Sequence, residues 1–306
     1  MSSDGYVKAA LESVERWLKK QGDTLKTKAA CVFPSGWKPE LDVTDLLKDE
    51  DASYYQQQIG ALRWMVELGR VDVLTEVSML AAYSAAPRLG HLAAILHVYA
   101  YLRAHNRSKL VFDPTKVDHD PHPKHDWADF YKGSEVIPAD RPEERGESIQ
   151  TTWCIVDSDH AGDLVSRRSR TGVLVFCNRA PIIFYSKKQG SIEGSSFGSE
   201  FSAMKTGIEL VEGLRYKLRM MGCPLDGATH IKADNMSVIH NCSKPASTLK
   251  KKSVGIAYHY CRERIAGGVC SATYSGCLFQ EQSRGCQTAA HAADHLLGFL
   301  SMSLAH

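Results

Sequence analysis

The stretch WCIVDSDHAGD, residues 153–163, decides which fold we expect for the second half of the chain. This stretch predicts a buried β-strand, and Asp157 follows Trp153 and Ile155 at period two, so it shares their face. The strand therefore ends in acidic residues. An acid at the end of an apolar strand either terminates the strand or belongs to a site, and this stretch alone leaves both interpretations open.

Two further carboxylates stand at informative positions. Glu200 comes three residues after Phe197 and four before Met204, so all three share one face of a predicted helix. A carboxylate on a buried stripe is costly unless it is paired or binds a metal, and a salt bridge to an arginine is the alternative here. Asp234 closes the strand in HIKADN and precedes a helix, which it would also suit as an N-cap.

Taken together, the three acids are harder to explain separately. A strand acid, a helix acid and a second strand acid can converge on one point above a sheet. Such a cluster repels itself strongly unless divalent cations bind to it. The sequence therefore predicts a metal site that performs phosphodiester chemistry.

The order of elements after residue 150 predicts an α/β fold with a mixed five-stranded sheet and flanking helices. We expect strands at 153–160, 171–178, 181–188, 229–235 and 267–275, and helices at 196–221, 236–242 and 254–266.

The first part of the chain is predicted to be mainly helical. The expected elements are a helix at 3–20 and three helices between residues 54 and 105, with junctions at Gly69 and Pro87. Residues 113–150, rich in Pro, Asp, Glu and His, form the expected linker. The predicted domains are therefore 1–112, helical, and 151–306, α/β, whose end from about residue 270 is divergent.

Charge is spread unevenly along the chain. Residues 1–150 carry 19 basic and 23 acidic side chains, whereas residues 151–270 carry 17 basic and 10 acidic ones. A basic surface around an acidic pocket suits a polyanion held over metal ions, although a merely solvated basic face is the alternative. The nine cysteines show no CxxC or zinc-ligand spacing, which indicates reduced, intracellular thiols. No apolar run is long enough to span a membrane.

Many separate motifs, in order, resemble the end of copia-type retrotransposon Pol polyproteins. The likeness to their ribonuclease H domain lies in VDSDHAGD (156–163), RRSRTG (167–172), APIIFYSKKQ (180–189), EGSSFGSEFSAM (193–204), ADN (233–235), STLKKK (247–252) and YHYCRE (258–263). Before the linker, the likeness is to the segment that joins the reverse-transcriptase palm to ribonuclease H, at Tyr55, Ile59-Gly60, Arg70-Val-Asp72, Val77-Ser78, Pro87, His91 and Tyr101-Leu102.

This resemblance implies hydrolysis of the RNA strand of RNA–DNA hybrids. Asp157, Glu200 and Asp234 would hold two Mg²⁺ ions about 4 Å apart, with Mn²⁺ as a substitute. The family has a fourth acid, and its best match is Asp294 in Ala292-Ala293-Asp294, although the connection from Gly268 is long and unlike the family. Met236 also departs from the family, which usually has a polar residue there.

The resemblance also implies partners. The RNA–DNA hybrid would be contacted at its phosphates, without sequence preference, by Arg167, Arg168, Lys187 and Lys188. The palm or other Pol segments would be protein partners, because the chain has no tyrosine-x-aspartate-aspartate motif and is not expected to synthesise DNA alone. The product is expected inside the cell, in a cytoplasmic particle or in the nucleus, and not in a membrane.

Other functions stay open. Gly194-Ser195-Ser196-Phe197-Gly198 fits the nucleophile elbow of serine hydrolases, with His240, His259 and Asp226 as conceivable partners. A second alternative is metal binding in the predicted linker, by Asp118-His119-Asp120, His122, His125 and Asp126. The remaining alternatives are a catalytically inactive element remnant and a structural module that binds nucleic acid or positions a polymerase.

Overall fold

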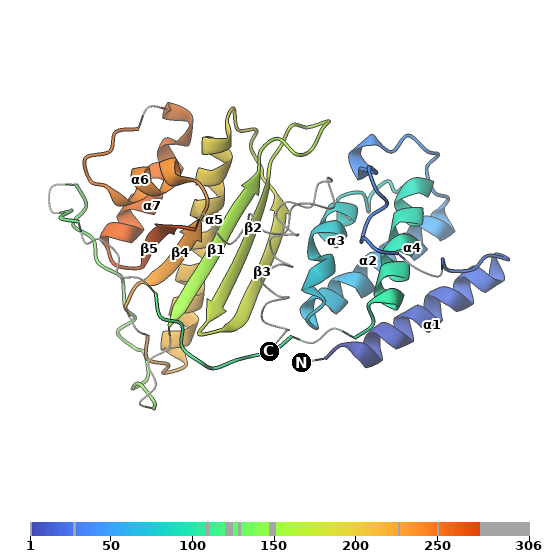
Figure 1. The fold of residues 1–306 in the computed structure, drawn as a ribbon, viewed down its shortest axis with the longest axis horizontal. Helices are drawn as coiled ribbons and strands as arrows, with labels where there is room; N and C mark the ends of the chain where they lie inside the picture. The colour runs from blue at the N-terminus through green and yellow to red at the C-terminus, as the bar shows by residue number, and fades with distance from the viewer. Residues whose placement is uncertain are drawn as a thin grey trace. The chain divides into compact units, whose positions relative to one another are not determined.

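The computed structural model describes residues 2–26, 29–107, 110–119, 125–127, 130–146, 151–225, 227–249 and 251–275 (Figure 1). The chain divides into two compact units, the first formed by residues up to Val111 and the second by most of the residues that follow.

The first unit is helical, as predicted. Its elements are α1 (Asp4–Lys20), the 3₁₀ turn η1 (Pro39–Leu41), α2 (Asp49–Glu67), η2 (Val71–Val73), α3 (Leu74–Ala81) and α4 (Leu89–Ala104). The expected stripe of α1, Val7 with Leu11, Val14 and Leu18, is buried in the core of this unit. Gly69 follows α2 with a φ of 106°, a conformation that favours glycine.

The second unit contains a mixed five-stranded sheet. Its strands are β1 (Thr152–Asp159), β2 (Arg170–Cys177), β3 (Ala180–Lys188), β4 (Thr229–Ala233) and β5 (Cys270–Tyr274). They lie in the order β3-β2-β1-β4-β5. The β1–β2 and β2–β3 pairs are antiparallel, and β4 runs parallel to both β1 and β5. This is the predicted fold class.

The helices of this unit pack on one face of the sheet. They are α5 (Ser196–Met220), α6 (Met236–Ser243) and α7 (Gly255–Ala266), the last preceded by the turn η3 (Lys252–Val254). Cys154 and Val156 of β1 point into the same core as Phe201 and Met204 of α5. Trp153 and Ile155 alternate with these residues on the opposite face and are buried as well, so the predicted buried strand is confirmed.

The described part of the predicted linker is irregular, but it contacts the second unit. Glu135 accepts hydrogen bonds from Arg215 and Arg219 of α5, each at 2.7 Å. The guanidinium of Arg262, on α7, stacks 4.8 Å from the ring centroid of Trp127. The predicted division into 1–112, 113–150 and 151–306 stays a prediction.

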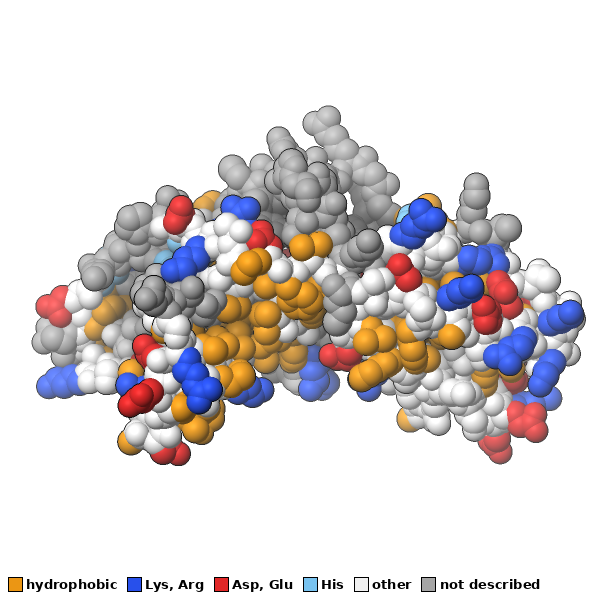
Figure 2. All heavy atoms as spheres, turned by 90° about the horizontal axis from the view of Figure 1, so that it is seen from below, with side chains coloured by type: hydrophobic (Ala, Val, Ile, Leu, Met, Phe, Trp, Pro, Cys, Tyr) orange, Lys and Arg blue, Asp and Glu red, His pale blue; other side chains and the backbone are white. Residues whose placement is uncertain are grey.

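Figure 2 shows the second unit from the end at which β1 begins, where hydrophobic side chains gather. Asp157 stands near the opposite end of that strand, so this hydrophobic area is not part of the predicted site. Within the described residues, no helix has the length and hydropathy that crossing a membrane requires.

Candidate metal centre

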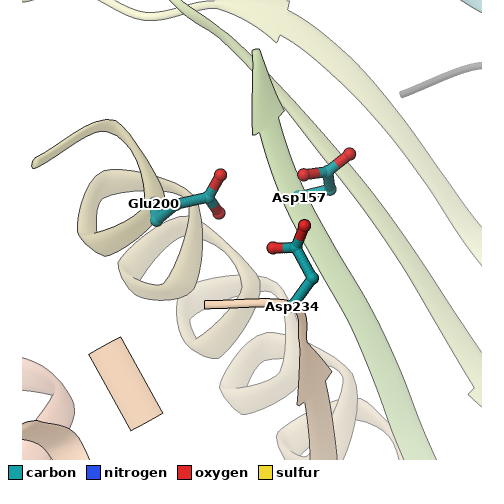
Figure 3. A group of neighbouring side chains, drawn as sticks. All are labelled: Asp157, Glu200 and Asp234. Carbon is teal, nitrogen blue, oxygen red and sulfur yellow. The ribbon is translucent and has the colours of Figure 1, made fainter. Parts of the chain in front are cut away.

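The three predicted carboxylates converge (Figure 3). Asp157 lies on β1 and Glu200 in the second turn of α5, and Asp234 is the residue that follows β4. One carboxylate oxygen of each lies within 4.8 Å of those of the other two. Among the described residues, this is the one group of three or more His, Cys, Asp or Glu side chains placed to hold a metal ion.

Glu200 is the buried member of this carboxylate triad. The residue is 7% exposed and directly precedes Phe201 of the core. Burial raises the pKa of Glu200 to about 9, and the negative charges of Asp157 and Asp234 add to that shift, while the nearby polar groups of Ser158 oppose it. No lysine or arginine in the described part of the chain forms an ion pair with Glu200, so the salt-bridge alternative is wrong.

Asp234 is exposed and does not cap the helix that follows. The strand ends at Ala233, one residue earlier than Asp234, and Asn235 is the N-cap of α6, where its Oδ1 accepts the Val238 N–H at 3.1 Å. The cap interpretation of Asp234 is therefore wrong, and its carboxylate points toward Asp157 and Glu200 instead. Met236, two residues after Asp234 and the first residue of α6, is 43% exposed.

Four basic residues were predicted to contact phosphates, and they lie at the same end of the sheet as Asp157. The β-ladders pair Asp159 with Arg170 and Arg170 with Lys188, which brings the end of β1, the start of β2 and the end of β3 together. Arg167 and Arg168 are exposed in the loop before β2, and Lys187 is exposed near the end of β3. Their role as phosphate contacts stays a prediction.

Asp294, Asp226, Asp120 and His122 lie outside the described residues. For the serine-hydrolase alternative, the structure gives the elbow a different role. Ser195 is the N-cap of α5, and its hydroxyl accepts hydrogen bonds from the Gly198 N–H and from Lys251 Nζ. Within the described residues, no hydrogen bond joins Ser196 to a histidine, and His259 contacts the Tyr131 hydroxyl instead. The triad of a serine hydrolase is not formed there.

Sequence reasoning missed the polar residues behind Glu200. Ser158 lies on the helix-facing side of β1, and Gln189 follows β3 with its side chain buried. The sequence did contain a signal for Ser158. This serine follows Cys154 and Val156 at period two, so it is a polar residue on a strand face that is otherwise apolar.

The chain is similar in sequence to part of known proteins. The chain is 23% identical over 235 residues to the retrovirus-related Pol polyproteins from transposons RE1 and RE2 of Arabidopsis thaliana. The chain is similar to part of a retrotransposon Pol polyprotein. The match covers 77% of this chain but only 14% of each polyprotein, so the Pol-like chain spans a small fraction of their length.

No protein-family model matches the chain. Among solved structures, ribonuclease H1 from the archaeon Halobacterium salinarum is similar, with 12% identity over 41% of this chain and 85% of that one, and a TM-score of 0.31. That score is low, so the fold assignment of the Pol-like chain rests on its sheet order and helix positions.

Proposed function

We propose that this chain is a divalent-metal-dependent endonuclease that hydrolyses the RNA strand of RNA–DNA hybrids. The observation that carries the proposal is the convergence of Asp157, Glu200 and Asp234 at one end of the sheet. Three carboxylates this close together destabilise one another, and a cation removes that repulsion. The similarity to part of retrotransposon Pol polyproteins is the supporting context.

The residues present fit a hard divalent cation. All three offer carboxylate oxygens, which Mg²⁺ and Mn²⁺ prefer. Glu200 Oε2 is buried and has no hydrogen-bond partner among the described residues, and a buried orphan oxygen calls for a ligand or a proton. When bound, such cations lower the pKa of coordinated water and stabilise a leaving oxygen. Asp157, Glu200 and Asp234 are the proposed ligands, and Asp294 is proposed as the fourth.

The substrate is proposed from charge and chemistry. Arg167, Arg168, Lys187 and Lys188 lie at the end of the sheet where Asp157 stands, and we propose that they contact the phosphates of a duplex without reading its sequence. A 2′-hydroxyl distinguishes RNA from DNA at the cleaved strand. In the polyprotein, the reverse-transcriptase palm would deliver the hybrid, in a cytoplasmic particle or in the nucleus.

The test is cleavage of a labelled RNA–DNA hybrid by the full chain with Mg²⁺. Wild type is compared with Asp157→Asn and Glu200→Gln, with EDTA as a further control. The proposal predicts activity that disappears in both variants and in EDTA. A folded wild-type protein that binds the hybrid without cutting it would instead favour the catalytically inactive nucleic-acid-binding module.

A further inference from the structure

The three carboxylates are not held in place by the same element. Asp157 lies on β1, and Asp234 directly follows β4, which pairs with β1 in parallel. Pairs such as Ile155 with Lys232 fix the register of these two strands. Glu200 stands on α5, a helix whose own backbone hydrogen bonds give it no register with the strands. Some interaction must therefore set the position of Glu200 along and above the strands.

A buried polar layer lies between the sheet and the first turns of α5. Its members are 8% exposed or less, and they are Ser158, Thr171, Gln189 and Ser199. Ser158 and Thr171 are directly opposite each other across the β1–β2 pair. Val156 and Val173, at the next positions of the same face, belong to the apolar core.

Gln189 joins the two sides of this layer. Its Nε2 donates to Thr171 Oγ1 of β2 and to the main-chain carbonyl of Ser199 on α5, both at 3.0 Å. Its own main-chain N–H donates to the Ser169 carbonyl at 2.8 Å, which continues the β2–β3 ladder. Because the Ser199 carbonyl can only accept, the amide nitrogen must face it, and this fixes the orientation of the side chain.

The amide group of Gln189 leaves one buried polar atom without a partner. Gln189 Oε1 is buried and has no hydrogen-bond partner in the described part of the chain. A buried orphan oxygen is unfavourable by about 1–3 kcal/mol, so packing alone would favour an apolar residue of the same length. An apolar residue would lack the two hydrogen bonds that Gln189 donates. One of these bonds is to the carbonyl of Ser199, the residue directly before Glu200.

We propose that Gln189 is a positioning residue for Glu200, which it holds at the metal centre by tying the first turns of α5 to β2. The inference rests on the proposed metal-dependent function, but it concerns binding geometry. Residues behind metal ligands typically change metal affinity or activity by about 10- to 100-fold when they are mutated. Mg²⁺ demands near-ideal octahedral geometry, so a displaced ligand weakens Mg²⁺ binding most.

The test is Gln189→Met in the full chain, because methionine keeps the length of the side chain and removes both donors. Mn²⁺ binding is measured without nucleic acid, from the electron paramagnetic resonance signal of the free ion. We expect Mn²⁺ affinity to fall about tenfold while circular dichroism shows a folded protein. Where hydrolysis is measured, the ratio of Mg²⁺- to Mn²⁺-supported rates should also fall.

Gln58→Met is the matched control. Gln58 is also buried, and its Oε1 accepts the Tyr99 hydroxyl at 2.7 Å in the helical unit, so this variant should bind Mn²⁺ like wild type. If Gln189→Met fails to fold, Thr171→Val decides, because it removes one of the two acceptors and should weaken Mn²⁺ binding severalfold. Wild-type Mn²⁺ affinity in the folded Gln189→Met, or in Thr171→Val when Gln189→Met does not fold, would overturn the inference.

The binding measurement keeps this inference separate from the proposed function. Weaker Mn²⁺ binding in the Gln189 variant, in a protein that cuts no hybrid, would support the positioning role and reject the nuclease. The opposite result is hybrid cleavage together with unchanged Mn²⁺ binding and an unchanged ratio of Mg²⁺- to Mn²⁺-supported rates in that variant. It would support the nuclease and reject the positioning role.

Discussion

Gly207 of α5 lies so close to β1 that a Cβ atom on it would stand 2.3 Å from Cγ1 of Val156. Val156 directly precedes Asp157, and Gly207 is seven residues after Glu200, about two helical turns along the same face. The absence of a side chain at Gly207 therefore allows the approach of helix to strand that brings Glu200 beside Asp157.

Gly207→Ala should move α5 away from the sheet. Inserting a methyl group into a packed core costs about 1–3 kcal/mol, and the displaced Glu200 should also weaken Mn²⁺ binding. Thermal unfolding and Mn²⁺ titration measure the two effects. Gly213→Ala is the control on the same helix, because a Cβ there meets nothing within 4 Å. That control should be neutral or stabilising by about 0.5–1 kcal/mol. Equal behaviour of the two variants would refute this explanation of Gly207.

The sequence predicted the sheet and the triad because both depend on local patterns. The apolar pattern identifies β1 with Asp157 near its end and α5 with Glu200 on its stripe, without knowledge of distant contacts. The start of α2 at Asp49 was missed, because the stretch DEDAS has no apolar periodicity. What favours a helix there is the set of acidic side chains in the first turn, which interact well with the helix dipole. The contacts of Glu135 and the Gln189 bridge were also not predictable, since they join residues 80 and 10 positions apart that no periodicity relates.

The stability of the metal-free protein should depend on pH through Glu200. Its pKa is about 9 when folded, against an ordinary value of 4.5, so the folded state binds the proton more tightly. The stability that the protonated carboxyl contributes is fully present below about pH 4.5 and is lost as the pH rises toward about 9. Urea unfolding in EDTA at several pH values should show a declining free energy of unfolding across this window.

Glu200→Gln should remove most of that decline. At pH 8 without metal, the variant should be more stable than wild type by on the order of 2–4 kcal/mol, because glutamine folds without the proton that the Glu200 carboxyl must take up on folding. Glu209→Gln, an exposed residue of the same helix that pairs with Lys205, serves as control and should leave the pH profile unchanged. A wild-type profile that is flat from pH 5 to 9 would argue against a buried, self-repelling triad.

Metal binding should release a proton. Near pH 7.5 Glu200 is still protonated, and a cation can bind its carboxylate only after displacing that proton. Isothermal titration with Mn²⁺ in buffers of different ionisation enthalpy should therefore give about one proton released per protein, and affinity should rise with pH up to about 9. Binding heats that are independent of the buffer would show that Glu200 is not a ligand or is already ionised.

Replacing the basic residues at the same end of the sheet as Asp157 should weaken hybrid binding uniformly across sequences. For Arg168→Ala with Lys187→Ala, the slope of log affinity against log salt should become shallower by about one for each phosphate that is no longer neutralised. Fluorescence anisotropy on two unrelated hybrid sequences measures both effects. Lys217→Ala, in the last turn of α5, is the control and should keep the wild-type slope. A change confined to one sequence would indicate base contacts instead.

The most direct measurement of the central claim follows each strand of one RNA–DNA hybrid, labelled with a different dye, during incubation of the full chain with Mg²⁺. We predict that only the RNA strand shortens, that DNA duplex of the same sequence stays intact, and that Asp234→Asn abolishes the cut. Cleavage of both strands, or RNA cleavage that persists in Asp234→Asn, would contradict the assignment of the triad to a hybrid-specific ribonuclease.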